Sequence, residues 1–317
     1  MYSEPRQAAD FLPLRPLPNS GTIGVIAPSS PIDQEKLQRG VTYLENKGFT
    51  VKIGESCYAR ETYLAGSDEL RAGDLMNMVD DDSIDAVFCA RGGFGTLRIL
   101  HMLDYDLIAS KRKMIVGYSD VTALHWAIYA RTGLPGFSAG MVASDFGRDP
   151  LNTTFEQNFW PLISHGNLEV QLPTSAEGTF ELNGTAMAGT LSVATKLLGT
   201  PFYPEVADPV CILEDIEEAM HKMEGYFQQL RLSGKFDELK GIILGNFTPD
   251  PNDPNKDYAS PQEVFMRIFS GVDFPVLSGI DYGHIPPKVA LPVGLPIRID
   301  ISPQRSTLTL VSHPFQK

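Results

Sequence analysis

The chain has 317 residues, of which 43% are hydrophobic and 21% charged, and its formal net charge at pH 7 is −13. A chain of this length exceeds the usual size of a single hydrophobic core, so two domains are expected. The acidic balance would repel the phosphates of nucleic acids and an anionic membrane surface, which excludes both as expected partners. A small or cationic ligand fits this charge better.

Neither a targeting segment nor a membrane span is predicted. The first twenty residues carry charges such as Glu4 and Arg6 and lack the continuous apolar stretch of a secretory signal. No later apolar run approaches the length of a membrane-spanning helix. Cys57, Cys89 and Cys211 cannot all pair with one another, and we expect reduced core thiols. The sequence therefore predicts a cytoplasmic protein.

Short apolar runs alternate with helical patterns in the first half of the chain. The predicted strands cover 22–27, 51–53, 84–90 and 114–117, and the predicted helices cover 33–47, 68–79, 96–103 and 121–131. This alternation predicts an α/β fold with a doubly wound parallel sheet, whose ligand sites lie beyond the carboxyl ends of the strands. The rule singles out three loops, 27–31, 90–96 and 117–120.

The second half of the chain has a different pattern. Pro, Gly, Ser and Thr in segment 166–180 predict a linker between an N-terminal domain, 1–165, and a C-terminal domain, 181–317. We expect the C-terminal domain to be α+β with a curved or barrel-like sheet. Its predicted helices cover 190–198 and 220–230, and its predicted strands cover 209–215, 241–246, 274–278, 289–293, 296–301 and 305–312.

The stretch Gly117-Tyr118-Ser119-Asp120 joins an apolar strand directly to a helix. A sharp turn of this kind lifts the serine hydroxyl off the sheet and places backbone N–H groups at a helix N-terminus, where negative charge is favoured. The arrangement is similar to a nucleophile elbow, although the second glycine of GxSxG is missing. The alternative is that Ser119 or Asp120 only caps the helix.

A second candidate loop, Arg91-Gly92-Gly93, follows the strand that ends at Ala90. Two adjacent glycines let the backbone approach a ligand and present N–H groups to an anion. The loop could form an oxyanion hole, a phosphate site or a plain tight turn. Nucleotide phosphate is disfavoured because the loop lacks the Lys-Ser/Thr pair of a P-loop and does not complete GxGxxG.

Two further candidates lie in the second half. Glu214 and Asp215 end the apolar run VCILED, where a carboxylate can be held rigidly, and His284 lies in the loop DYGHIPPK. His284 could be a catalytic base or a solvated loop histidine. The other histidines show neither HxH nor HExxH spacing, so we expect no metal and no other cofactor.

Together these motifs resemble the LD-carboxypeptidases, a serine peptidase family with a Ser-Glu-His triad. The resemblance implies that Ser119 is the nucleophile, Glu214 the triad carboxylate and His284 the base. The matching blocks follow the family's order over most of the chain: GVIAPSSP (24–31), YLAGSDELRAGDL (63–75), RGGFG (91–95), GYSDVT (117–122), AGTLSVATKLLGTPF (188–202), LEDIEE (213–218), GIILGNFT (241–248) and GHIPPKVALPVG (283–294).

The resemblance also implies the remainder of the site. The backbone N–H groups of Gly93 and Asp120 would form the oxyanion hole. By its position immediately before the glycine turn, and not by the resemblance, Arg91 is a candidate to bind the terminal carboxylate of the substrate, although it could equally pair with an acidic side chain at the edge of the core. Gly92 in the same turn is a second candidate substrate contact. The site would lie in a cleft between the domains. One departure from the family pattern is the segment Phe137-Ser138-Ala139-Gly140-Met141, where family members often have His-Gly-Pro.

As a function, the resemblance implies a cytoplasmic carboxypeptidase that hydrolyses an L,D-peptide bond and releases the terminal D-alanine of a murein tetrapeptide in cell-wall recycling. Family members are commonly homodimers. Two alternatives stay open. One is a microcin C self-immunity peptidase, which cleaves an aminoacyl-nucleotide amide, although the chain has no obvious large insertion. The other is a non-catalytic muropeptide-binding protein, against which the presence of all three triad residues argues.

Overall fold

The computed structural model describes residues 10–151, 153–173, 179–254, 259–286 and 288–315. The strands are β1 (Thr22–Ile26), β2 (Thr50–Ile53), β3 (Ala86–Cys89), β4 (Met114–Gly117), β5 (Gly136–Ser138), β6 (Glu169–Leu172), β7 (Phe180–Thr190), β8 (Pro209–Glu218), β9 (Gly241–Pro249), β10 (Val276–Ser278), β11 (Leu291–Ile301) and β12 (Ser306–Leu310). The α-helices are α1 (Gln34–Asn46), α2 (Asp68–Asp80), α3 (Thr96–Ile99), α4 (Tyr105–Lys111), α5 (Thr122–Thr132), α6 (Glu156–His165), α7 (Leu191–Thr195), α8 (Met220–Leu232), α9 (Lys235–Glu238) and α10 (Pro261–Ile268).

The first half forms the predicted parallel sheet. Strands β2, β1, β3, β4 and β5 lie side by side in this order, and all neighbours are parallel. Every residue of β3 and β4 is buried, so both faces of these strands are covered. Parallel strands covered on both faces are continuous apolar runs in sequence, and this pattern led to their prediction.

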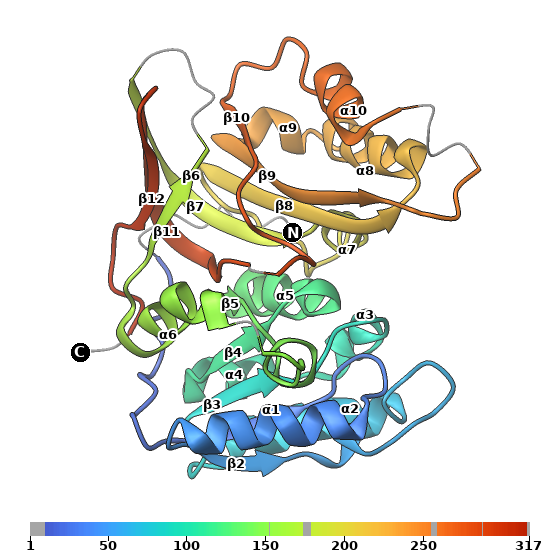
Figure 1. Cartoon of the computed structure of the whole chain (residues 1–317), viewed down its shortest axis with the longest axis vertical. Helices are drawn as coiled ribbons and strands as arrows, with labels where there is room; N and C mark the ends of the chain where they lie inside the picture. Colours follow the sequence, from blue (N-terminus) through green and yellow to red (C-terminus); the bar gives the residue numbers. More distant parts are fainter. Residues whose placement is uncertain (1–9, 152, 174–178, 255–258, 287, 316–317) are drawn as a thin grey trace.

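The second half extends the same sheet (Figure 1). Antiparallel pairing of β11 with β5 and with β7 joins the two halves, and β7, β8, β9 and β10 continue as parallel strands. In Figure 1, strand β12 lies at a steep angle to β8 and β9, so the sheet is curved. Within the described residues the sheet does not close into a barrel, because β2 and β10 end its path.

Several elements differ from the prediction. Strand β7 is absent from the predicted elements because its first residues are exposed and it contains Gly184 and Gly189, which weaken a strand pattern. The two strands predicted at 289–293 and 296–301 are one strand, β11. Its register shifts between Val293 and Leu295, since Gly294 adopts a φ of 82° there.

The predicted linker, 166–180, contains strand β6 and the first residue of β7, and its residues 174–178 lie outside the described part of the chain. The domain boundary therefore stays a prediction. Buried apolar side chains from both halves form one cluster. All three cysteines are buried and free. None of the described helices has the length and apolar character needed to cross a bilayer.

Candidate active site

Ser119 lies where β4 meets α5, in a short 3-10 turn that covers Ser119–Val121. Its φ is 65°, a left-handed conformation that is strained for a residue with a side chain and is often found at functional sites. The side chain does not cap the helix, and within the described residues its hydroxyl has no hydrogen-bond partner. The helix-cap alternative for Ser119 is therefore wrong.

Asp120 connects this turn to the glycine loop. Its buried carboxylate accepts a hydrogen bond from the N–H of Thr96, 2.8 Å away at the start of α3. The hydroxyls of Thr96 and Ser29 are hydrogen bonded at 2.9 Å, and Ser30 Oγ accepts from the N–H of Phe94 at 3.1 Å. The three loops that the sequence singles out, 27–31, 90–96 and 117–120, therefore lie against one another.

Gly92 and Gly93 allow this close approach. A Cβ atom on Gly92 would lie 2.8 Å from Ser119 Oγ and 3.4 Å from the Asp120 nitrogen. Gly93 has a φ of 119°, and a Cβ there would overlap the side chain of Ser30. Within the described residues, the N–H groups of Gly93 and Asp120 have no acceptor. Such unpaired N–H groups can stabilise a developing negative charge.

Arg91 precedes the glycines and is exposed. Its Nη1 donates to the carbonyl oxygen of Pro31 at 2.9 Å, so this guanidinium is held partly by the neighbouring loop. A guanidinium has further donors, which leaves capacity to bind an anion.

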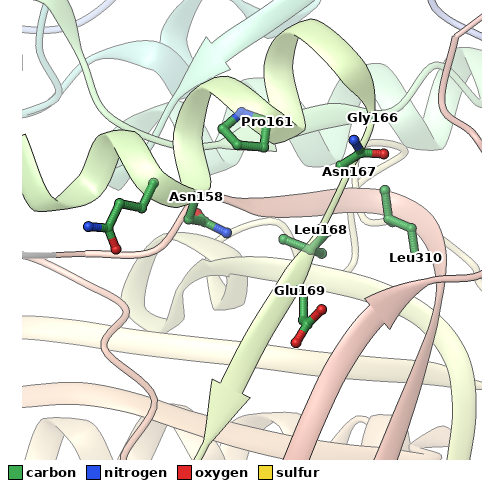
Figure 2. A pocket seen from close by; sticks show the side chains of 8 residues that line it. Asn158, Pro161, Gly166, Asn167, Leu168, Glu169 and Leu310 are labelled. Carbon is green, nitrogen blue, oxygen red and sulfur yellow. The ribbon is translucent and has the colours of Figure 1, made fainter.

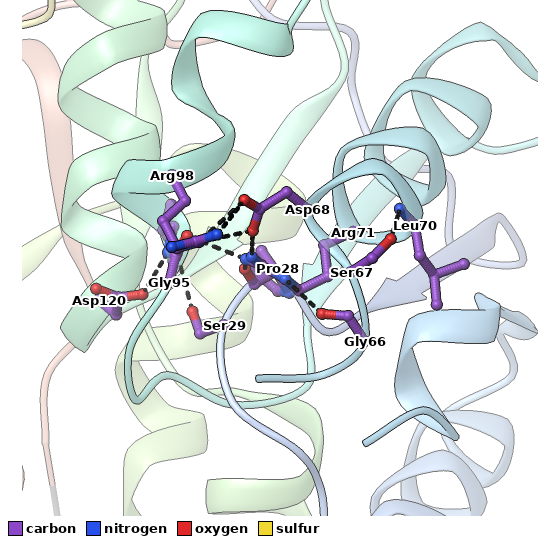
Figure 3. A network of polar contacts seen from close by, with 11 residues as sticks. Pro28, Ser29, Gly66, Ser67, Asp68, Leu70, Arg71, Gly95, Arg98 and Asp120 are labelled. Carbon is purple, nitrogen blue, oxygen red and sulfur yellow. Dashed lines mark hydrogen bonds and ion pairs between the residues drawn. The ribbon is translucent and has the colours of Figure 1, made fainter. Parts of the chain in front are cut away.

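Arg71 was not identified from the sequence, yet it holds these loops together (Figure 3). Its side chain is fully buried in α2. Nη1 donates to the carbonyl oxygens of Pro28 at 2.6 Å and Gly95 at 3.0 Å. Nε donates to the carbonyl of Gly66 at 3.3 Å, and Asp68 forms an ion pair with Nη2. Burial lowers the pKa of the Arg71 guanidinium, and the charge of Asp68 opposes this effect.

His284 and Glu214 form a hydrogen-bonded pair. His284 Nδ1 lies 2.8 Å from Glu214 Oε2, and the Glu214 side chain is only 1% exposed. The second oxygen, Oε1, accepts from the hydroxyl of Thr190 at 2.5 Å. Because an ionised carboxylate can only accept, Nδ1 must donate, and a neutral imidazole then leaves Nε2 free to take a proton. A general base requires this tautomer.

The ring of His284 also packs against the residue before the serine. The ring centroids of Tyr118 and His284 are 5.0 Å apart at an interplanar angle of 60°. Ser119 and His284, both among the described residues, are not hydrogen bonded to each other. Catalytic hydrogen bonds of this kind are often long in ligand-free structures and tighten when substrate binds.

Asp215 is directed away from the histidine. Its carboxylate accepts from the N–H of Ser192 at 2.7 Å, from the hydroxyl of Ser192 at 3.1 Å and from the N–H of Ile216 at 3.0 Å. Burial, and then the charge of Glu214, raise the pKa of Asp215 to about 7. Successive residues of a strand point to opposite faces, so Glu214 and not Asp215 reaches His284.

The larger cavities lie elsewhere. Figure 2 shows one of about 340 Å³ between α6 and β6, lined by Gln157, Asn158, Pro161, Gly166, Asn167, Leu168, Glu169 and Leu310. None of the predicted site residues lines it. A small pocket of about 20 Å³ lies beside the loop of His284, and both halves line it: Gly140, Asp145, Arg148, Phe155, Ile285, Pro286 and Lys288. No group of three or more His, Cys, Asp or Glu side chains in the described ranges is arranged to hold a metal ion.

Comparison with known proteins agrees with the geometry. A probable murein peptide carboxypeptidase of Bacillus subtilis is 34% identical over 276 residues, which cover 86% of each chain. The microcin C7 self-immunity protein MccF of Escherichia coli is 28% identical over 328 residues, covering 93% of this chain and 94% of that protein. The crystal structure of a muramoyltetrapeptide carboxypeptidase from Oxalobacter formigenes aligns with a TM-score of 0.85 and 27% identity, covering 92% of this chain and 99% of that chain.

The family assignment covers both halves of the chain. Residues 23–139 match the LD-carboxypeptidase N-terminal domain, which contains Ser119. Residues 183–299 match the LD-carboxypeptidase C-terminal domain, which contains Glu214 and His284. The chain therefore belongs to the LD-carboxypeptidase family of serine peptidases.

Proposed function

We propose that this chain is a carboxypeptidase that hydrolyses an L,D-peptide bond and releases the C-terminal D-alanine of a murein tetrapeptide. The observation that carries the proposal is the His284–Glu214 pair at 2.8 Å, with the imidazole packed against Tyr118 beside Ser119. The names of the Bacillus and Oxalobacter relatives support the substrate class.

In the proposed mechanism, Ser119 Oγ attacks the carbonyl carbon of the scissile bond while His284 Nε2 takes its proton. Glu214 orients the imidazole and stabilises its cation. The N–H groups of Gly93 and Asp120 stabilise the oxyanion. His284 then returns the proton to the amine of the departing D-alanine, which leaves an acyl group on Ser119. His284 activates water to hydrolyse this ester and restore the enzyme.

Arg91 and Gly92 are the proposed substrate contacts. Arg91 would pair with the free carboxylate of the terminal residue, and Gly92 would let the substrate approach Ser119. A cytoplasmic location and a homodimeric assembly complete the proposal.

A second candidate is the hydrolysis of an aminoacyl-nucleotide amide. The observation that favours it is the likeness to MccF, whose structure in complex with glutamyl sulfamoyl guanosine aligns with a TM-score of 0.84 at 25% identity. The same serine chemistry would cleave either bond. Parallel assays with a tetrapeptide and a glutamyl sulfamoyl nucleoside, compared by kcat/KM, decide between the two substrates.

The test of the proposed function is D-alanine release from a purified murein tetrapeptide. We expect release by the wild type, which chelators do not reduce, and almost none by Ser119→Ala. The variant should keep the far-UV spectrum and melting temperature of the wild type, since only the covalent step needs the hydroxyl. Equal release by wild type and Ser119→Ala would eliminate Ser119 as nucleophile. A wild type without release would eliminate the tetrapeptide as substrate.

A further inference from the structure

Lys288 is a buried cation four residues after His284. It is 8% exposed, and its Nζ lies 2.9 Å from Asp145 Oδ1 in an ion pair. The same Nζ lies 3.3 Å from the centre of the Tyr118 ring. No acceptor in the described part of the chain is aligned for a regular hydrogen bond with Nζ. The carboxylate and the aromatic face are therefore its main electrostatic partners.

A buried ammonium is unfavourable unless close partners compensate its charge. An apolar side chain of similar length, such as methionine, would fill the same space without this desolvation penalty. Buried charges of this kind are frequent at functional sites, although ion pairs with a purely structural role also occur. The contacts of the Lys288–Asp145 ion pair decide between a functional and a purely structural role.

The contacts lead directly to the catalytic residues. Tyr118 meets the ammonium of Lys288 with its face, packs against the ring of His284 and precedes Ser119 in the chain. Asp145 is anchored in the first half of the chain, because its Oδ2 accepts from the N–H of Met141 at 2.8 Å. Lys288 therefore connects the loop of His284 to the half that carries the serine.

A second contact lies on the other side of His284. The hydroxyls of Tyr282 and Ser138 are hydrogen bonded at 2.6 Å, and both residues are buried. Tyr282 and Lys288 thus flank His284 in the loop. Their partners, Ser138 and Asp145, both belong to the first half, and Ser138 lies in the segment that departs from the family pattern.

We propose that Lys288, through its ion pair with Asp145 and its contact with Tyr118, is a positioning residue that holds His284 in register with Ser119. The inference rests on the proposed function, since it assigns a role toward the same triad. Lys288 does not touch the reacting atoms in this role. Its side chain sets the location and the electrostatic environment of the base.

The charge of Lys288 has a consequence that a purely steric role lacks. Among the described residues, the charged groups that act on the ammonium are Asp145, Glu214 and Arg148. The ring of Tyr118 lies against the ammonium, and Tyr118 in turn interacts with Tyr282. Burial lowers the pKa of Lys288, and the charge of Asp145 opposes this effect. A cation near the Glu214–His284 pair disfavours a second positive charge on the imidazole. Removing the cation should therefore move the acid limb of the pH profile to higher pH.

The experiment compares Lys288→Met with the wild type. We expect kcat for D-alanine release to fall about tenfold or more with little change in KM, and the acid limb of kcat/KM to move upward by about one pH unit. The NMR signals of the His284 ring should also differ between the two proteins without substrate. Because this NMR readout needs no substrate, it separates failure of the inference from failure of the proposed function. Failure of the proposed function would appear as a wild type that releases no D-alanine.

Lys113→Met is the matched control. Lys113 is also buried, at 2% exposed, but its ammonium donates to the carbonyl oxygens of Met78 and Asp81. This variant should lose stability without changing the pH profile or the NMR signals of the His284 ring. If Lys288→Met does not fold, Tyr282→Phe tests the contact on the other side of His284, because it removes the hydroxyl that bonds Ser138. We expect the kcat of Tyr282→Phe to fall severalfold at unchanged KM.

Asp145→Asn completes a double-mutant cycle. Alone it should be at least as harmful as Lys288→Met, because it leaves the ammonium without its counter-charge, and the double variant should lose less than the product of the two single effects. A Lys288→Met protein with wild-type kcat and an unshifted pH profile would overturn the proposal. A change in kcat and in the pH profile that Lys113→Met reproduces would overturn it as well.

Discussion

Replacement of Glu214 by glutamine tests the geometry of the buried carboxylate. Each oxygen accepts one hydrogen bond, Oε2 from His284 and Oε1 from the Thr190 hydroxyl. Glutamine has the same shape but offers one acceptor and one donor group, so its NH₂ must face one of the two partners. The outcome depends on which partner that is.

The two orientations differ greatly in activity. If the NH₂ faces Thr190, the hydroxyl rotates to accept it, the Nδ1–H···O bond survives and only the charge is lost. Hydrogen bonds to charged and neutral acceptors differ by about 1–1.5 kcal/mol, or roughly tenfold in rate. If the NH₂ faces His284, the imidazole is forced into the wrong tautomer, and an analogous change in another triad lowers kcat about 10⁴-fold.

The rotatable hydroxyl of Thr190 favours the first orientation. We therefore expect Glu214→Gln to lower kcat about ten- to a hundredfold. Addition of Thr190→Val removes the acceptor for the NH₂, so the amide should turn toward His284 and the loss should approach about 10⁴-fold. Thr190→Val alone keeps the His284–Glu214 bond and should have a small effect.

The assay is steady-state release of D-alanine by the wild type, both single variants and the double variant. Far-UV spectra and melting temperatures check that each protein is folded. Two results would refute the reasoning: a Glu214→Gln protein with wild-type kcat, or a double variant no worse than Glu214→Gln.

Two further predictions concern the glycine loop and a buried histidine. Gly92→Ala should lower D-alanine release about a hundredfold or more, because its methyl group would displace Ser119. The control Gly73→Ala, which has open space on α2, should remain active and gain about 0.5–1 kcal/mol of stability, and an active Gly92→Ala would contradict the close approach. Burial lowers the pKa of His125 to about 4 from an ordinary value of 6.5. The stability contributed by the neutral His125 imidazole is complete above pH 6.5, its ordinary pKa, which applies in the unfolded chain. It is lost as the pH falls through the folded pKa of about 4. Denaturant titrations should show that His125→Gln reduces the acid-induced loss of unfolding free energy by about 3 kcal/mol, and an unchanged loss would show that His125 is not responsible.

The sequence predicts what depends on local pattern. Continuous apolar runs indicate buried parallel strands, and the strands at 84–90 and 114–117 were recognised for this reason. The rule for the carboxyl ends of parallel strands then singles out the loops of Gly92 and Ser119 from the sequence alone. Ser119, Glu214 and His284 were assigned roles by resemblance to a family and not by spacing, because the bond between Glu214 and His284 spans 70 residues of chain.

Contacts between distant segments required the tertiary structure. Which carboxylate faces His284 depends on which side of β8 each residue occupies, and the neighbours Glu214 and Asp215 are equivalent in sequence until β8 is paired with β7. Arg71 and Lys288 look like ordinary surface cations in sequence. Packing buries both of them, because the carbonyls around Arg71 and the carboxylate beside Lys288 come from other segments that only the folded chain brings together.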